Sequence, residues 1–106
     1  SLTNAVSRIR ISSNVFVEVE VRNMAELKEA LDAGADRIML DNWDADGITQ
    51  AVALVNKKVP IEVSGNMTVD RVREISGTGI DFISVGRITH SFKSLDLSLL
   101  IEKESG

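Results

Sequence analysis

The sequence lacks cysteine altogether and has few aromatic side chains, with three Phe, one Trp and no Tyr among its 106 residues. Without cysteine, the chain can form neither disulfides nor thiolate metal sites. With so few aromatic rings, platforms on which nucleic-acid bases could stack are not expected. The net charge of −4 and the pI near 4.9 leave no basic stripe for a phosphate backbone. These absences argue against a nucleic-acid-binding protein.

The sequence also has no apolar run long enough to cross a membrane, and no leader with a basic start and a small-residue cleavage site. No membrane partner is therefore expected, and a cytoplasmic location is the default. The composition, 43% hydrophobic and 26% charged, is typical of a soluble globular protein, and the length suits one modest domain. The acidic balance favours contacts with metal ions, sugar hydroxyls or cations.

Short runs rich in β-branched residues alternate with helical patterns along the chain. Strands are expected at 15–21, 36–41, 59–64 and 81–86, and helices at about 2–12, 23–34, 44–57 and 68–77. This order predicts an α/β fold in which parallel strands are joined by right-handed helical crossovers. Segments 33–41 and 78–86 share a common pattern, which suits a TIM-like barrel built by repetition or an open doubly wound sheet. No GxGxxG dinucleotide fingerprint follows the first strand.

Four polar side chains recur at nearly even spacing along these strands. Glu20, Asp41 and Glu62 are each twenty-one residues apart, and Ser84 lies twenty-two further on. All four are expected at or near the carboxyl ends of their strands, where the ligand sites of parallel α/β folds form. Because side chains alternate along a strand, the valines of the first strand would pack on the helices, while Glu18 and Glu20 would line the barrel interior.

Glu20 and Asp41 are the main catalytic candidates. Two carboxylates on neighbouring strands can bind magnesium, accept hydrogen bonds from sugar hydroxyls or stabilise a developing positive charge. Alternatively, they are solvated strand-end acids or partners of arginines elsewhere. For Glu18 and Glu62, pairing with a lysine or arginine inside the barrel and a role in function are equally reasonable interpretations.

Two loops rich in small residues follow the third and fourth strands. Ser64, Gly65 and Asn66 offer backbone N–H groups just before a helix, an arrangement that binds anions. In the second loop, residues 84–91, Gly86 allows close backbone approach, and Arg87 and His90 could contact a phosphate. Otherwise His90 is an ordinary loop residue and Arg87 a surface ion-pair partner.

Two residues beside Asp41 allow more than one interpretation. Trp43 could shield a site from water, although covering a helix end is the commoner role for such a residue. Asn42 either orients Asp41 or caps the helix that follows. The sequence does not decide between these alternatives.

Taken together, five segments resemble one enzyme family. They are VEVEV (17–21), AGADRIMLDN (33–42), VPIEVSGNMT (59–68), GIDFISVGRITHS (79–91) and LDLSL (95–99). In this order and spacing they resemble the carboxyl-terminal part of quinolinate phosphoribosyltransferase, over about residues 1–101. Each segment is weak evidence by itself, but the combination is specific.

The resemblance implies an enzyme of NAD biosynthesis. It would transfer the 5-phosphoribosyl group of phosphoribosyl pyrophosphate to the ring nitrogen of quinolinate, using Mg²⁺ and releasing pyrophosphate and CO₂. It implies that Glu20 and Asp41 contact the ribose hydroxyls and the metal-bound pyrophosphate. The implied phosphate cradle comprises Ser64, Gly65 and Asn66 in one loop and Val85, Gly86 and Arg87 in the next, with His90 close by.

The chain departs from the family pattern in length. Family enzymes carry an amino-terminal domain, earlier barrel strands and a KDNH-type segment that supply cations for quinolinate. We therefore expect residues 1–106 to be a carboxyl-terminal portion of the barrel, inactive alone, with partners in the remaining half of the enzyme and in a homodimer or higher homo-oligomer. The alternatives are a self-associating phosphate-binding half-barrel and another phosphosugar-binding barrel enzyme.

Overall fold

The computed structural model describes residues 15–86, 88–98 and 100–101 of the chain. The helix expected at 2–12 lies outside these residues. The described elements are β1 (Glu18–Val21), α2 (Met24–Asp32), β2 (Arg37–Asp41), α3 (Ala45–Val55), β3 (Ile61–Ser64), α4 (Val69–Ile75), β4 (Phe82–Val85), β5 (Ile88–Ser91) and the short 3₁₀ helix η1 (Phe92–Ser94). The predicted alternation of strands and helices is therefore confirmed for this part of the chain.

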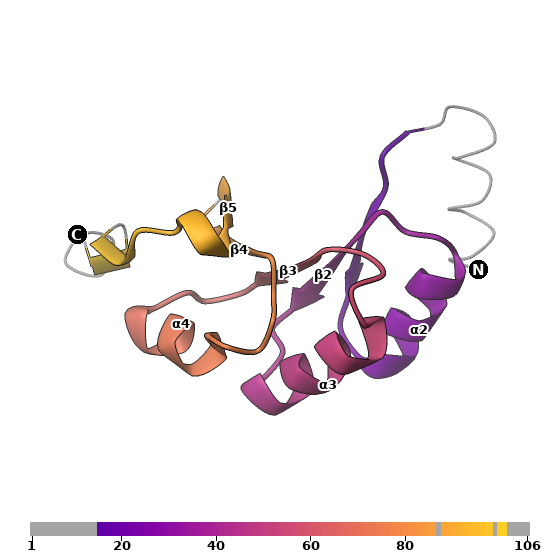
Figure 1. The fold of residues 1–106 in the computed structure, drawn as a ribbon, viewed down its shortest axis with the longest axis horizontal. Coiled ribbons are helices and arrows are strands. Elements are labelled where there is room, and N and C mark those ends of the chain that lie inside the picture. The colour runs from indigo at the N-terminus through magenta and orange to yellow at the C-terminus, as the bar shows by residue number, and fades with distance from the viewer. Residues whose placement is uncertain (1–14, 87, 99, 102–106) are drawn as a thin grey trace.

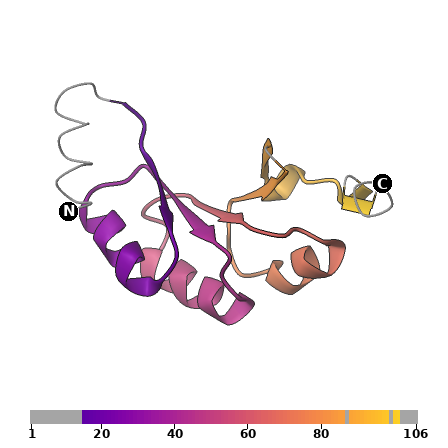
Figure 2. The same cartoon turned by 180° about the vertical axis from the view of Figure 1, so that it is seen from behind.

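The strands form one sheet in the order β1-β2-β3-β4-β5, and the pairings among β1, β2, β3 and β4 are parallel. Figures 1 and 2 show α2, α3 and α4 side by side along one face of this sheet. Each helix connects two neighbouring parallel strands, as expected for repeated βα units.

Side-chain caps fix where the three helices begin. Asn23 accepts a hydrogen bond from the Glu26 amide (2.9 Å), and Asp44 accepts one from Gly47 (2.7 Å). Thr68 caps α4 as predicted, through the amide of Arg71 (3.0 Å). Such caps satisfy amide donors that have no partner within the helix. Since Asp44 caps α3, the alternative in which Asn42 is the cap is wrong.

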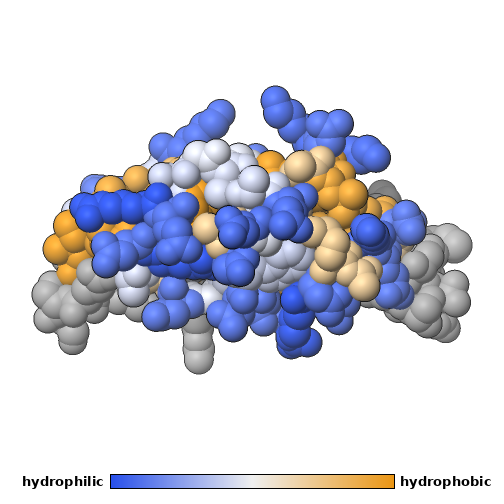
Figure 3. Space-filling view, turned by 90° about the horizontal axis from the view of Figure 1, so that it is seen from below, coloured by the Kyte–Doolittle hydropathy of each residue, from blue (hydrophilic) through white to orange (hydrophobic). Residues whose placement is uncertain are grey.

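The hydrophobic core lies between the sheet and the helices. Strand residues on this face include Val21, Leu40, Val63 and Ile83, all with no exposed area. Helix residues that pack against them include Leu27, Ile48 and Ile75. The outer surface of the helices is seen in Figure 3, where hydrophilic residues dominate the middle of the view. This distribution is what amphipathic helices on one face of a sheet produce.

Residues 84–91 were expected to form a loop, and that expectation is wrong in part. Strand β4 extends to Val85, and β5 then returns antiparallel to it, with Ser84 opposite Thr89. Gly86 has a φ of +65°, in the left-handed region that tight hairpin turns require. The β-branched Ile88 and Thr89 favour a strand after that turn, so the segment forms a hairpin.

Trp43 is a buried structural residue, 8% exposed, that links two strand ends. Its indole Nε1 donates a hydrogen bond to the Val21 carbonyl oxygen (3.0 Å). The ring also covers the first turn of α3, because a Cβ built on Gly47 would lie 3.2 Å from its Cε3 atom. The interpretation of Trp43 as a residue that covers a helix end is confirmed.

We predict that Trp43→Phe destabilises the fold by about 1–2 kcal/mol, because the buried Val21 carbonyl loses its donor and the smaller ring leaves a gap. Urea unfolding followed by far-UV circular dichroism measures this change. The matched control is Phe92→Leu, which shortens a half-buried ring elsewhere without removing a hydrogen-bond donor. An unchanged unfolding midpoint for Trp43→Phe would contradict the assigned role.

Candidate functional site

Glu20 and Asp41 lie beside one arginine that the sequence reasoning missed. Arg22 places its Nη2 3.8 Å from Glu20 Oε1 and its Nε 3.6 Å from Asp41 Oδ2. The Arg22 side chain is 71% exposed, and those of Glu20 and Asp41 are 49% and 31% exposed. Such exposed pairs contribute at most about 1 kcal/mol and are screened by salt. The structure thus brings both acids to one place while leaving them accessible to a ligand.

The even spacing of the acids does not put them on one level of the sheet. Glu20 lies opposite Met39, which in turn lies opposite Glu62. Asp41 lies opposite Ser64, two residues nearer the carboxyl ends of the strands. Asp41 and Ser64 therefore form the rim, and Glu20 and Glu62 both lie one step below it, on the same level as Met39.

The predicted loop after β3 packs directly against the residue that follows Asp41. The Asn42 amide donates to the Ser64 carbonyl oxygen (3.2 Å), and a Cβ built on Gly65 would lie 3.7 Å from the Asn42 nitrogen. Both Asn42 (φ +59°) and Gly65 (φ +131°) have positive φ. Asn66 follows and is exposed, like Gly65. The Ser64–Asn66 loop and Asp41 are thus neighbours at the rim, as the sequence predicted.

Glu18 and Glu62 both pair with Arg37, which confirms the ion-pair interpretation of these two acids. The Arg37 Nε lies 2.5 Å from Glu18 Oε2 and 3.7 Å from Glu62 Oε1. The Arg37 guanidinium also faces the rings of Phe16 (5.4 Å) and Phe82 (4.8 Å), a cation–π arrangement. Arg37 is the residue directly opposite Glu18 in the parallel register, so this pairing follows from a register that the sequence pattern alone does not give.

The site residues predicted in the second loop, 84–91, do not all lie on the face of the sheet that carries Glu20 and Asp41. Gly86 forms the tight turn between β4 and β5, directly after Val85. Arg87 lies outside the described residues. His90 is opposite Ile83 in the hairpin, so it shares the face of the sheet that packs on the helices. The structure does not bring His90 onto the face that carries Glu20 and Asp41.

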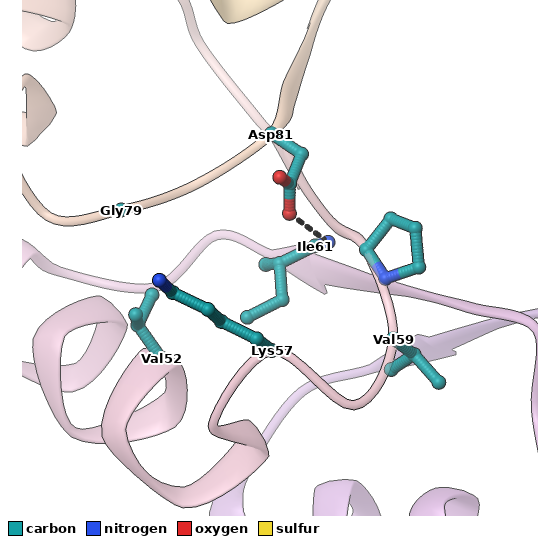
Figure 4. Close-up of a pocket in the computed structure, with 7 residues that line it drawn as sticks. Val52, Lys57, Val59, Ile61, Gly79 and Asp81 are labelled. Atoms are coloured by element: carbon teal, nitrogen blue, oxygen red, sulfur yellow. Dashed lines mark hydrogen bonds between the residues drawn. The ribbon is translucent and has the colours of Figure 1, made fainter.

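A separate pocket of about 340 Å³ lies at the other end of the strands. It is lined by Val52, Lys57, Val59, Pro60, Ile61, Gly79 and Asp81. In Figure 4 the Asp81 carboxylate accepts a hydrogen bond from the Ile61 amide (2.9 Å), where β3 begins. The amino ends of strands in α/β barrels are associated with stability, and none of the predicted site residues lines this pocket.

Comparison with known proteins identifies the family of this chain. The family described as "Quinolinate phosphoribosyl transferase, C-terminal domain" matches residues 1–100. The chain belongs to this family. It is 41% identical over 85 residues to a probable nicotinate-nucleotide pyrophosphorylase (carboxylating) of Bacillus subtilis, and 44% identical over 96 residues to the one of Methanocaldococcus jannaschii. These matches cover 80% and 84% of this chain but 29% and 34% of the relatives, so the chain spans about a third of their length.

Solved structures support the same assignment. The nicotinate-nucleotide pyrophosphorylase of Francisella tularensis matches with a TM-score of 0.75 and 41% identity, covering 85% of this chain and 34% of that one. The enzyme of Ehrlichia chaffeensis matches with a TM-score of 0.76 and 39% identity, covering 81% and 32%. The parallel βα units are therefore part of a TIM-like barrel, as predicted.

The comparisons do not bear out the cytoplasmic expectation. A rice relative is named as chloroplastic and a tobacco relative as mitochondrial. Among the residues that the structure describes, no helix has both the length and the apolar character needed to span a membrane. The location of this chain stays a prediction.

We predict that Glu18 makes the stability of the fold pH-dependent. Burial, followed by the nearby Glu62 carboxyl, raises the pKa of Glu18 above its ordinary value of 4.5. The native state then binds this proton more tightly than the unfolded state does. The resulting stabilisation is complete below pH 4.5 and is lost as the pH rises through the raised native pKa.

The test compares the wild-type chain with Glu18→Gln by urea unfolding at pH 4 and pH 7. Glutamine does not titrate, so the stability of wild type relative to Glu18→Gln should fall between the two pH values. A relative stability that rises with pH would show that Glu18 is held as the carboxylate, with its pKa lowered, and would contradict the prediction.

Proposed function

We propose that this chain is the carboxyl-terminal part of an enzyme that transfers the 5-phosphoribosyl group from phosphoribosyl pyrophosphate to quinolinate. The products are nicotinate mononucleotide, pyrophosphate and CO₂, in the biosynthesis of NAD. Family membership supports the reaction. The observation that carries the proposal for this chain is that Asp41 and the Ser64–Asn66 loop are joined at one rim of the sheet, with Glu20 next to them through Arg22.

In this proposal Glu20 and Asp41 accept hydrogen bonds from the ribose hydroxyls. As pyrophosphate leaves, positive charge develops at the anomeric carbon, and nearby carboxylates stabilise that charge more than they stabilise the ground state. In the proposal, the backbone N–H groups of Gly65, in the loop after β3, and of Gly86, in the β4–β5 turn, bind the phosphate of the substrate. Arg22 is exposed enough to release the acids when the sugar binds.

Mg²⁺ is the proposed cofactor, and Glu20 and Asp41 are the residues that would hold it. The described residues contain no group of three acidic or histidine side chains arranged for a metal ion. Two partly exposed carboxylates nevertheless suit Mg²⁺, which is often held by one or two carboxylates together with substrate phosphates and waters. When bound, the ion would neutralise charge on the departing pyrophosphate.

The part of the site described here is rich in acids and glycines. The net charge of −4 offers little to bind the carboxylates of quinolinate. We propose that those cations come from the parts of the relatives' length that this chain does not span, and that the active species is a homodimer or higher homo-oligomer. By itself the chain is then expected to be inactive.

The test is complementation. The chain is mixed with the preceding segment of the Bacillus subtilis relative, and nicotinate mononucleotide is quantified by chromatography with quinolinate, phosphoribosyl pyrophosphate and Mg²⁺ present. We expect product only from the mixture, and a loss of about 10²-fold with Asp41→Asn, the effect of removing one electrostatic contact to the transition state.

The control is Asp70→Asn, the same substitution at a 97% exposed side chain on α4. It should leave the rate of the mixture unchanged. Steady turnover by the chain alone would contradict the proposed dependence on the other segment. Full activity of Asp41→Asn would contradict the role of that carboxylate.

A further inference from the structure

Glu62 is the one charged side chain among the described residues that is almost fully buried, at 1% exposure. It lies on β3, two residues before Ser64, where the first predicted loop begins. Its Oε2 atom accepts hydrogen bonds from the hydroxyls of Ser84 on β4 and Thr89 on β5 (the latter 3.2 Å). Glu62 therefore contacts both strands of the hairpin whose turn contains Gly86.

The second carboxylate oxygen of Glu62, Oε1, lies next to the side chain of Arg37. Oε1 has no hydrogen-bond partner among the residues that the structure describes, but it faces the Arg37 Nε at 3.7 Å. Burying a carboxylate is unfavourable unless a cation and hydrogen bonds compensate. Arg37 supplies the charge and the two hydroxyls supply the hydrogen bonds, so these partners hold the side chain in one position.

The backbone alone connects β3 and β4 only weakly at this end of the sheet. The parallel ladder between them comprises two residue pairs, Glu62 with Phe82 and Val63 with Ile83, whereas β1 with β2 and β2 with β3 each have four. Within the described part of the chain, β3 and β4 form no further pair after Val63, where both strands approach the predicted loops. The Glu62 side chain bridges the strands at the point where the ladder ends.

We propose that Glu62 is a positioning residue that fixes the Gly86 turn relative to the Ser64–Asn66 loop, acting through Ser84 and Thr89. The inference deepens the proposed function and rests on it, because the two loops are the expected binding site for the phosphate of a phosphorylated ribose. A phosphate bound by both loops requires a fixed distance between them. Glu62 sets that distance without touching the ligand.

The test separates hydrogen bonding by Glu62 from simple filling of space. Glu62→Gln keeps the size and one acceptor oxygen, whereas Glu62→Leu keeps a similar volume and accepts nothing. In the leucine variant Arg37 keeps its ion pair with Glu18 and stays partly exposed, at 24%, so no buried charge is left without a partner and the variant is expected to fold. The double variant Ser84→Ala/Thr89→Val removes the two donors and leaves Glu62 in place.

Ribose 5-phosphate is titrated into the ¹⁵N-labelled chain, and the shifts of the Gly65 and Gly86 amides give the dissociation constant. We expect Glu62→Gln to bind within about threefold of wild type, and Glu62→Leu and the double variant to bind at least about tenfold more weakly. Glu74→Gln, at an exposed residue of α4, is the control and should not change binding. Wild-type affinity in Glu62→Leu would overturn the proposal.

A second measurement without ligand keeps the two proposals distinguishable. Residual dipolar couplings report the orientation of the β4–β5 hairpin relative to β3. The hairpin should keep its orientation in Glu62→Gln and lose it in Glu62→Leu and in the double variant. If wild type does not bind ribose 5-phosphate, the proposed phosphate site fails, whereas the couplings still decide the positioning role. An unchanged orientation in Glu62→Leu would overturn that role.

Discussion

Burial of one aliphatic face of the sheet is the constraint on which the rest of the structure depends. Val21, Leu40 and Val63 have no exposed area beneath the helices. A slip of one residue between paired strands would exchange the two faces and place charged side chains such as Glu62 under the helices. The unfavourable burial of such charges fixes the register, and the register in turn decides which polar residues meet on the opposite face.

Much of the fold could be predicted because local patterns and packing agree. Period-two alternation in 15–21, the caps Asn23 and Thr68, and the order of the elements all predict parallel βα units. The β5 strand could not be predicted in the same way. The sequence after Gly86 is compatible with a loop or a strand, and only its pairing with β4 makes it a strand. That pairing also decides which face His90 occupies.

In the candidate site, too, some features follow from the local sequence and others only from the pairing of strands. Its loops and acids are visible in the sequence, but their level in the sheet depends on register. Glu20 and Asp41 were predicted from a repeat of twenty-one residues, whereas the observed partners Glu20–Met39 and Met39–Glu62 are nineteen and twenty-three residues apart. Because these offsets are unequal, Glu20 and Glu62 share one level with Met39, and Asp41 lies two residues nearer the carboxyl ends of the strands. The contact of Arg22 with both acids could not be predicted for a related reason: Arg22 follows β1, so the alternating pattern of the strand does not include it.

Strand position and depth together explain why acidic side chains have different roles on one face: Glu62 is on β3, between β2 and β4, whereas Glu20, at the same level, is on β1 at the end of the described sheet and is exposed. Below the rim, water cannot reach Glu62, so its charge must be balanced by Arg37 and its lone pairs by hydroxyls. At the rim, the ion pair of Asp41 within the described part of the chain is with an exposed arginine at 3.6 Å, a contact that solvent and salt readily screen. Glu62 is held through Oε2 by two hydroxyls and faces the Arg37 charge through Oε1, which keeps it in one position. The Asp41 carboxylate is partly exposed and can accept hydrogen bonds from a ligand.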